Sequence, residues 1–467
     1  MKTCRIVIKD QVNCLIQGLS ATTAKKLEKR FTFTVPGAYH MPSYQLGRWN
    51  GKVKLFNDGW FYVNLLDSDV LDLIQEDGYE LDVIDERQDF VPDPQPIAED
   101  SFSHLEGAPM LREYQVAAAN MAFSLTCGIF KMATGAGKSY VCAAVSRGFS
   151  EYGRVVVVVP SVDLVSQTAA SFRALGIVPC GEFCGSVKAV ERVTITTWQS
   201  LDNFPELLEG ASCIIVDETH RVKASVLGEI MTGPGAKAPR RFGFTGTLPD
   251  NDLDRARVLA AMGPVVFEKT TWELQTSGVL AKSHINIVQT KDGLPRGQDA
   301  YEYDVEYKRL THDKDRLRWV AEMISEASES GNTMVLVKNV ETGRRLAELL
   351  GDKAVFVSGS TKNKTRKQEY DSMSSADGKI LVCTKGIAST GIDIPRIFNL
   401  FLFEAGKNFI EVIQSIGRGL RRVEGDKESV EIYDVCSDSK YSARHMRERK
   451  KYYDDAKFRY THLKVTY

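Results

Sequence analysis

The first 88 residues combine short alternating strands with two amphipathic helices. Alternation with a period of two is typical of half-buried strands, and apolar residues three or four positions apart are typical of helices. The turn Asn57-Asp-Gly59 predicts a β-hairpin of Lys52–Phe56 with Trp60–Val63. The pattern therefore predicts a small α+β domain over residues 1–88. Its other predicted strands are Arg5–Lys9, Asn13–Gln17 and Tyr79–Ile84, and its helices run from a cap at Thr22 or Thr23 to Lys29 and from Asp67 to Gln75.

Residues 89–109 contain prolines and acids without periodicity, which predicts a linker. From Leu111 onward, aliphatic runs alternate with helical stretches. Runs such as Val155–Val159 suit a parallel sheet that is covered on both faces. We therefore expect two doubly wound α/β domains in tandem, over residues 110–282 and 283–467. The predicted strands are Gly128–Lys131, Arg154–Val159, Val193–Thr197, Cys213–Val216 and Arg241–Phe244 in the first domain, and Thr333–Val337, Ala354–Val357, Lys379–Cys383, Asn399–Phe403 and Val430–Val435 in the second.

A glycine-rich segment, Met132-Ala-Thr-Gly-Ala-Gly-Lys-Ser139, lies between a predicted strand and a predicted helix. Such a turn directs backbone N–H groups and the positive end of the helix at one point, where a phosphate binds. We expect Lys138 to reach the terminal phosphates of ATP and the Ser139 hydroxyl to bind Mg²⁺. Met132 is a departure, because the usual pattern has glycine there. The residues predicted to hold the nucleotide in this loop are Thr134, Gly135, Ala136, Gly137, Lys138 and Ser139.

Two acids follow the buried strand Cys213–Val216 directly. The carboxyl end of a strand in an open parallel sheet faces the ligand crevice. Asp217 is therefore predicted to hold Mg²⁺, and Glu218 to orient or deprotonate the attacking water. Upstream of the glycine-rich loop, Gln115 offers both a donor and an acceptor to the adenine edge, and Arg112 lies beside it.

The segment Gln414-Ser-Ile-Gly-Arg-Gly-Leu-Arg-Arg422 lies in the second predicted domain. Arg418 and Arg421 are three residues apart, so a helix presents both on one face. A guanidinium offered to a phosphate during its transfer acts as an arginine finger. We therefore predict Arg418 and Arg421, together with Gln414, as catalytic residues.

These motifs together resemble the DExH helicases of superfamily two, over residues 111–422. The N-terminal segment 46–55 and Thr197-Trp-Gln-Ser200 further resemble the UvsW-type branch-migration helicases of phages. The motifs that carry the family resemblance are Gln115, the loop Thr134–Ser139, Asp217-Glu-Thr-His220, Phe244-Thr-Gly-Thr247, the 414–421 segment, Pro160-Ser-Val-Asp-Leu-Val-Ser-Gln167 and Cys383-Thr-Lys-Gly-Ile-Ala-Ser-Thr-Gly-Ile-Asp393.

The resemblance implies two RecA-like domains and an ATP-driven DNA helicase or translocase. It implies action on branched, forked or partly single-stranded DNA, including branch migration, fork regression and D-loop or R-loop unwinding, in replication, recombination and repair. Gly391 and Asp393 are then expected near the nucleotide. The residues implied in coupling are His220, Thr245, Gly246 and Thr247, and those implied to face the nucleic acid are Ser161, Gln167, Thr197, Trp198, Lys338, Asn339, Thr384 and Lys385.

The formal net charge is −1, so contacts with nucleic acid must come from local patches. Arg48, Lys52 and Lys54 lie beside aromatic residues in the predicted hairpin and are candidate DNA contacts. Residues 440–467 hold nine Lys or Arg against three Asp or Glu. Either they contact nucleic acid, or they form a docked helix with a solvated basic face.

Scattered cysteines and the absence of a long apolar run predict a reduced, cytoplasmic protein, in the host cytoplasm if a phage encodes it. A monomer without membrane contact is expected. Two alternatives stay open. One is a DExH RNA helicase, with RNA in R-loops as a related partner, and the other is a nucleotide-gated clamp that binds branched DNA without unwinding it.

Overall fold

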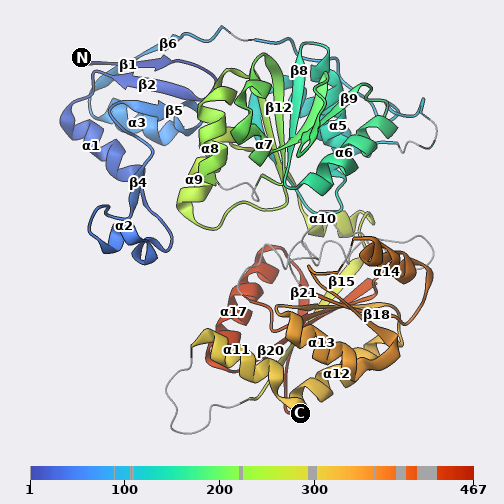
Figure 1. The fold of residues 1–467 in the computed structure, drawn as a ribbon. Helices are drawn as coiled ribbons and strands as arrows, with labels where there is room; N and C mark the ends of the chain where they lie inside the picture. The colour runs from blue at the N-terminus through green and yellow to red at the C-terminus, as the bar shows by residue number, and fades with distance from the viewer. Residues whose placement is uncertain are drawn as a thin grey trace. The chain divides into compact units, whose positions relative to one another are not determined.

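A computed structural model describes residues 2–88, 90–105, 107, 110–219, 224–292, 302–361, 363–384, 396–406 and 429–467. The chain divides into two compact units (Figure 1). The first unit comprises residues 1–132 and 137–268, and the second comprises residues 133–136 and 269–467. No helix in these ranges combines the length and the apolar character that a membrane crossing requires.

The first unit begins with a small four-stranded sheet in the order β5-β2-β1-β6. Leu27 from α1 and Val70 and Ile74 from α3 pack with the strands into one core. Helix α1 begins after Ser20, whose hydroxyl accepts a hydrogen bond from the N–H of Thr23. The predicted cap at Thr22 or Thr23 is therefore wrong. The elements are β1 Lys2–Ile8, β2 Asn13–Gln17, α1 Ala21–Arg30, β5 Trp60–Tyr62, α3 Ser68–Glu76 and β6 Tyr79–Asp85.

The predicted hairpin is wrong, although its turn is present. Asp58 and Gly59 have φ angles of 50° and 84°, as a tight turn requires. The flanking strands separate, however, because β5 pairs with β2 while β4 (Lys52–Lys54) pairs with β3 (Thr32–Thr34). The β3–β4 ribbon carries a projection that contains α2, Pro42–Gln45 (Figure 1).

This N-terminal module packs directly on the first α/β domain. The buried Arg241 donates a 2.6 Å hydrogen bond to the carbonyl oxygen of Gln11, and Asn64 donates one of 2.9 Å to that of Ala260. The segment predicted as a linker is packed as well. Arg240 donates to the carbonyl oxygen of Val91 and to the Asp93 carboxylate, and Phe102 is buried.

The first α/β domain is built on an eight-stranded sheet in the order β10-β9-β11-β8-β12-β13-β7-β14. Alternate residues of β8 and β12 pack on the core with α8 and α9, so aliphatic runs fill both faces. The strands are β7 Cys127–Met132, β8 Arg154–Val159, β9 Cys180–Cys184, β10 Val187–Lys188, β11 Val193–Thr197, β12 Ala211–Asp217, β13 Arg240–Thr245 and β14 Val265–Lys269. The helices are α4 Glu113–Ser124, α5 Lys138–Ser150, α6 Val162–Ala174, α7 Trp198–Asn203, α8 Ala224–Thr232 and α9 Asp252–Met262, and α10 Thr271–Thr276 follows in the second unit.

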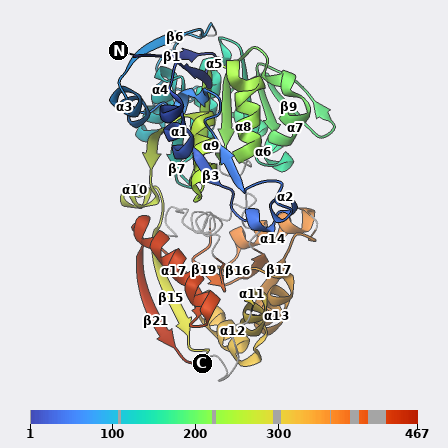
Figure 2. The ribbon, with the colours of Figure 1, turned by 90° about the vertical axis from the view of Figure 1, so that its left-hand side faces the viewer.

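The second α/β domain holds a seven-stranded, all-parallel sheet in the order β17-β18-β16-β19-β20-β15-β21 (Figure 2). Two strands were not predicted: β21, at the edge of the sheet, and β15, which lies between β20 and β21. Apolar residues of α12 and α13 pack on one face. The strands are β15 Lys282–Thr290, β16 Thr333–Val337, β17 Ala354–Val357, β18 Ile380–Thr384, β19 Asn399–Phe403, β20 Ser429–Ser437 and β21 Arg459–Val465. The helices are α11 Tyr303–His312, α12 Lys314–Ser328, α13 Val340–Leu350, α14 Asn363–Ser375 and α17 Lys440–Asp455.

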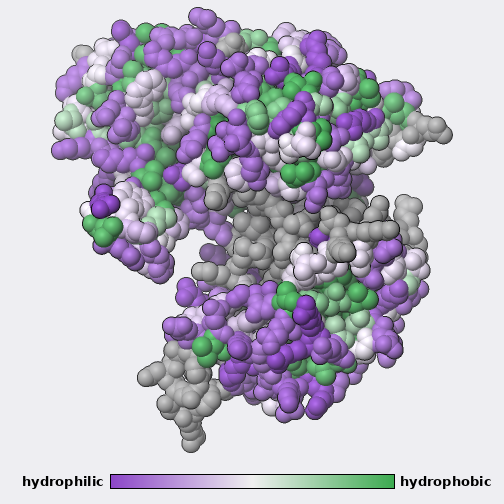
Figure 3. Space-filling view, in the orientation of Figure 1, coloured by the Kyte–Doolittle hydropathy of each residue, from purple (hydrophilic) through white to green (hydrophobic). Residues whose placement is uncertain are grey.

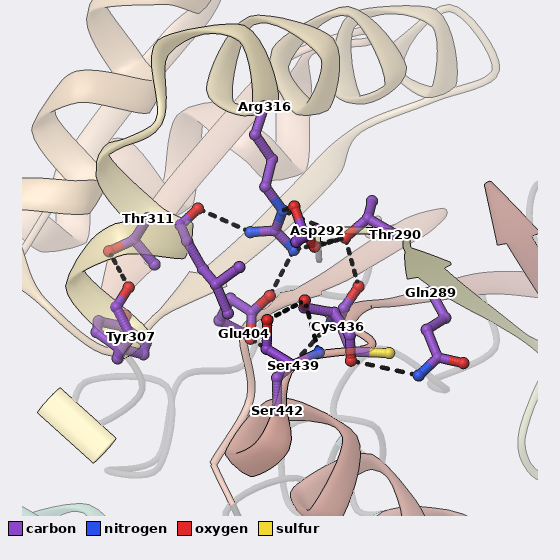
Figure 4. Close-up of polar contacts among 12 residues, drawn as sticks. Gln289, Thr290, Asp292, Tyr307, Thr311, Arg316, Glu404, Cys436, Ser439 and Ser442 are labelled. Carbon is purple, nitrogen blue, oxygen red and sulfur yellow. Dashed lines mark hydrogen bonds and ion pairs between the residues drawn. The ribbon is translucent and has the colours of Figure 1, made fainter. Parts of the chain in front are cut away.

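Buried charges join the strand ends of this second domain (Figure 4). Arg316 on α12 contacts Asp292 after β15 at 3.4 Å and Glu404 after β19 at 2.5 Å. Glu404 also accepts a 2.7 Å hydrogen bond from Ser442 on α17. Arg316 has no measurable side-chain exposure. If α12 or α17 moved away from the sheet, a buried charge would lose its partner, which is strongly destabilising. The network therefore fixes the packing of α12 and α17 against the sheet.

Candidate nucleotide-binding site

The glycine-rich loop connects β7 to α5 as predicted. Gly135 and Gly137 have φ angles of 86° and 75°, in the left-handed region that favours glycine. A Cβ on Gly137 would lie 2.3 Å from the side-chain nitrogen of Gln115, so a larger residue would also displace that amide. Met132, which replaces the expected glycine, is the buried last residue of β7. The helix N-terminus that follows is of the kind that binds phosphate.

Lys138 opens α5 and lies close to an acid from the neighbouring strand. Its ammonium is 3.4 Å from Oε1 of Glu218 and donates a 3.4 Å hydrogen bond to the carbonyl oxygen of Met132. Burial alone would lower the pKa of Lys138, but the carboxylates of Glu218 and Asp217 outweigh it and raise the pKa above its ordinary value. Lys138 is therefore held protonated, as a phosphate ligand must be.

Asp217 and Glu218 leave the carboxyl end of β12 in a strained turn. Glu218 has a φ of 50°, and its N–H donates a 2.9 Å hydrogen bond to Oδ1 of Asp217. A non-glycine residue at positive φ costs free energy and often marks a functional site. Both acids are only partly buried. A hydroxyl and a carboxylate suit Mg²⁺, so Ser139 at the first turn of α5 and Asp217 fit as its protein ligands.

Gln115 is buried at the first turn of α4. Its Oε1 accepts a 2.9 Å hydrogen bond from the N–H of Arg112, and its side-chain nitrogen faces Gly137. The structure thus brings the predicted adenine-binding residue against the phosphate loop, while the side chain of Arg112 is exposed.

The strand ends of the first domain bring the other predicted residues to one edge of the sheet. Parallel pairing sets Thr197 beside Val159 and Asp217 beside Phe244, so β8, β11, β12 and β13 end together. Ser161 follows β8 as the N-cap of α6, with Gln167 exposed on that helix. Thr197 caps α7, and the following Trp198 packs partly against the core.

The segment that follows β13 contains a buried hydroxyl that has no partner within the described ranges of the chain. Thr245 donates a 2.6 Å hydrogen bond to the carbonyl oxygen of Thr247 and accepts one of 3.2 Å from its N–H. Oγ1 of Thr247 is buried and has no hydrogen-bond partner among the described residues. Gly246 between them is partly buried. A buried polar group left unpaired costs free energy, which is consistent with a functional role.

The sequence prediction missed Thr219. This fully buried residue donates to the carbonyl oxygens of Val216 at 3.0 Å and Phe244 at 3.3 Å. It therefore ties the turn that holds Glu218 to the strand that precedes Thr245. The only signal was its place inside the Asp-Glu-Thr-His motif.

In the second domain, Lys338 directly follows β16. Its ammonium lies 4.3 Å and 4.8 Å from the ring centres of Tyr303 and Tyr307 and 3.5 Å from Asp304. Asn339 is the exposed N-cap of α13 and makes no side-chain capping bond, and Thr384 ends β18. The predicted residues His220, Lys385, Gly391, Asp393, Gln414, Arg418 and Arg421 lie outside the described residues.

Among the three basic residues predicted in the N-terminal module, Arg48 and Lys52 are exposed. Lys54 instead contacts Glu28 at 2.6 Å, which neutralises part of its charge. The basic segment 440–467 belongs to the fold, because α17 docks on the sheet through the buried Arg449 and Tyr453, and β21 pairs with β15.

Two RecA-like domains, the first with a phosphate loop beside a partly buried lysine–carboxylate pair, define the class of the nucleic-acid motor ATPases. The family model for the res subunit of type III restriction enzymes matches residues 109–250, and that for the helicase conserved C-terminal domain matches residues 315–423. The chain is a member of the superfamily-two helicases.

Individual relatives agree with this membership. The chain is 23% identical to the ATP-dependent DNA helicase uvsW of Enterobacteria phage T4, over 92% of this chain and 90% of that protein. It is 26% identical to the DNA 3'-5' helicase XPB of Kineococcus radiotolerans, over 72% of this chain and 62% of that protein. The structure of the helicase MrfA bound to DNA and AMPPNP aligns with a TM-score of 0.57 at 15% identity, over 80% of this chain and 55% of that one.

Proposed function

We propose that the chain is an ATP-driven DNA helicase that remodels branched DNA. The observation that carries this proposal is the arrangement of Lys138, Glu218 and Gln115 around the loop before α5. This arrangement offers a positive charge to the phosphates, a base to a water molecule and an amide to the adenine. The similarity to the phage T4 DNA helicase along 92% of this chain supports DNA as the track.

ATP and Mg²⁺ are the proposed substrate and metal. Lys138 and the N–H groups of the loop bind the β- and γ-phosphates, and Gln115 with Arg112 selects adenine. Ser139 and Asp217 hold Mg²⁺, which when bound neutralises charge on the phosphates. Glu218 then takes the proton of the attacking water. Gln414, Arg418 and Arg421 are proposed to contribute charge during phosphate transfer, with Gly391 and Asp393 near the nucleotide.

Hydrolysis is proposed to change the grip on DNA through the segments that follow β12 and β13, with His220, Thr245, Gly246 and Thr247 as coupling residues. Short hydroxyl and amide side chains bind phosphates without reading bases, as a motor on any sequence requires. The proposed DNA contacts are Ser161, Gln167, Thr197, Trp198, Lys338, Asn339, Thr384, Lys385, Arg48, Lys52 and Lys54.

The decisive experiment is a substrate panel with the purified chain. ATP hydrolysis is measured with single-stranded, duplex, forked and four-way DNA and with RNA, and strand separation is measured on the same substrates. We expect branched DNA to stimulate hydrolysis and to be unwound. Stimulation by RNA alone would establish the DExH RNA helicase instead, and binding of branched DNA without strand separation would establish the clamp. The monomeric state, the action on R-loops and the cytoplasmic location stay predictions.

A further inference from the structure

The projection on the β3–β4 ribbon, residues 35–51, forms a compact tip; we call it the tip below. The N–H of Val35 donates a 2.8 Å hydrogen bond to the carbonyl oxygen of Gly51, which closes its base. Gly51 has a φ of 73°, and a Cβ there would lie 3.0 Å from both Ala38 and the ring of Tyr44. At the far end, the N–H of Arg48 bonds to the carbonyl oxygen of Ser43 at 2.9 Å. The tip is therefore preformed.

Large apolar side chains point outward from this tip. Tyr39 is 63% exposed, Leu46 64%, Tyr44 42% and Met41 40%. The ring of His40 lies 4.0 Å from that of Tyr39. In Figure 3 the projection shows a small green area among pale and purple residues. Four such side chains on one small protrusion indicate a contact surface, because single exposed apolar residues are ordinary but a cluster is not.

The charges around the tip indicate the chemistry of the partner that it binds. Residues 31–57 contain no Asp or Glu. Arg48 and Lys52 are exposed and make no ion pair within the described part of the chain. A partner that is anionic and also offers flat apolar faces satisfies both features at once. Nucleic-acid bases beside their phosphates have this chemistry, since aromatic side chains stack on bases of any sequence.

We propose that the tip is a strand-separating wedge: Tyr39, Tyr44 and Leu46 pack against the base pair at the DNA branch point while Arg48 and Lys52 hold the adjacent phosphates. The inference rests on the proposed helicase function. Proteins insert apolar wedges between base steps to unstack them. A preformed tip suits this role, since it loses little conformational freedom on contact.

The test is the triple variant Tyr39→Ala/Tyr44→Ala/Leu46→Ala in the full chain. None of these residues takes part in the nucleotide site. We expect ATP hydrolysis stimulated by single-stranded DNA to stay within about twofold of wild type. We expect strand separation on a fork to fall at least about tenfold. The control is Tyr152→Ala, an exposed tyrosine that follows α5, and it should change neither rate. Equal unwinding by the triple variant and wild type would overturn the wedge.

A second measurement locates the DNA directly. Iododeoxyuridine placed at the branch point of a fork is photo-crosslinked to the wild-type chain, and peptides are identified by mass spectrometry. Crosslinks at residues 35–51 support the wedge, and crosslinks only elsewhere overturn it. A tip-dependent dimer in sedimentation, with no crosslink to the tip, would show that a second copy covers this surface. If no DNA stimulates ATP hydrolysis by the wild type, the proposed function fails. Crosslinking still decides separately whether the tip contacts the branch point of the DNA.

Discussion

The ammonium group of Lys138 lies 3.4 Å from Oε1 of Glu218, across the gap between α5 and β12. Lys138 is predicted to bind phosphate and Glu218 to accept the proton of water. Because they contact each other, the lysine is paired with the group that must later act as a base. A bound γ-phosphate competes for the same ammonium, so nucleotide binding and release of the Glu218 carboxylate are linked in this geometry.

Glu218→Gln should therefore separate binding from hydrolysis. The amide keeps the size of the side chain but cannot accept a proton, and loss of a general base typically costs about 10²- to 10⁴-fold in rate. ATP affinity should be kept, because Lys138 loses a competing carboxylate. Lys138→Ala should instead lose both ATP affinity and hydrolysis. Calorimetry with a non-hydrolysable analogue and phosphate-release kinetics measure the two effects. Glu209→Gln, at the other end of β12, is the control, and an unchanged hydrolysis rate in Glu218→Gln would remove Glu218 as the base.

Gln115 should recognise adenine as well as cap α4. In Gln115→Glu the carboxylate still accepts the hydrogen bond from the N–H of Arg112, as Glu does in a capping box, but the amide donor is lost. We expect both Gln115→Glu and Gln115→Ala to raise the KM for ATP about tenfold and to reduce its preference over GTP. Steady-state hydrolysis of both nucleotides measures this. If only Gln115→Ala is affected, Gln115 has a structural role alone.

Thr247→Val tests the role of the buried Thr247 hydroxyl. The substitution removes a group that makes no hydrogen bond among the described residues, so stability should change little. If Thr247 couples hydrolysis to movement, the number of base pairs opened per ATP should fall about 5- to 150-fold. This is the fold-change that coupling free energies of about 1–3 kcal/mol usually produce. Thr245→Val, at another proposed coupling residue, breaks two hydrogen bonds to Thr247 at about 1 kcal/mol each, so it should lower stability where Thr247→Val does not. Normal coupling in Thr247→Val would assign the hydroxyl no role.

The local pattern of apolar and polar residues was enough to predict the central strands of both sheets. It failed for elements whose pairing depends on residues far away in the sequence. The β-branched run Val155–Val159 predicts a strand buried on both faces, and β8, Arg154–Val159, confirms it. β21 is an edge strand whose residues are mostly exposed, so its polar sequence carries no burial pattern. The turn at Asp58 and Gly59 is local and was predicted. The partner of β5 is not local, because Phe61 is drawn into the core beside Phe31 and Phe56.

The candidate site likewise combines features that the local sequence predicts with contacts that depend on distant residues. The spacing of glycine, lysine and acid predicted that the loop before α5 and the acids after β12 lie together, because carboxyl ends of parallel strands lie at one edge. It did not predict Thr219, whose hydroxyl reaches the strand end at Phe244, since that contact depends on the pairing of β12 with β13. It left open whether residues 440–467 contact nucleic acid or form a docked helix, and it did not predict that Arg449 is buried against Asp434.

Arg449→Leu should strongly destabilise the second unit. Arg449 donates hydrogen bonds of 2.9 Å and 2.8 Å to the two oxygens of Asp434, which also accepts one from Tyr453. Removing one partner of a buried pair costs about 3–5 kcal/mol. Arg447→Leu, on the exposed side of α17, should cost less than about 0.5 kcal/mol. Peroxide oxidation of the buried Met334 and Met446 across a urea series reads this unit alone. Equal midpoints for the two variants would contradict the buried pair.

Asp292 and Glu404, both bound to Arg316, should titrate with opposite effects on stability. Burial opposes the charge of Asp292, but Arg316 and hydrogen bonds outweigh it and lower its pKa. Its contribution is therefore present above about pH 4, the unfolded pKa, and is lost as the pH falls through the folded value. Burial raises the pKa of Glu404 despite Arg316. Its contribution is present at low pH and is lost as the pH rises through that raised value.

Urea midpoints from methionine oxidation between pH 3 and pH 8 test this pair. The difference between wild type and Asp292→Asn should shrink as the pH falls below about 4. The difference between wild type and Glu404→Gln should shrink as the pH rises. Asp315→Asn, at an exposed carboxylate on the same helix as Arg316, is the control variant. Parallel trends for the two variants would mean that Arg316 holds both carboxylates ionised alike, and the assignment of opposite shifts would be wrong.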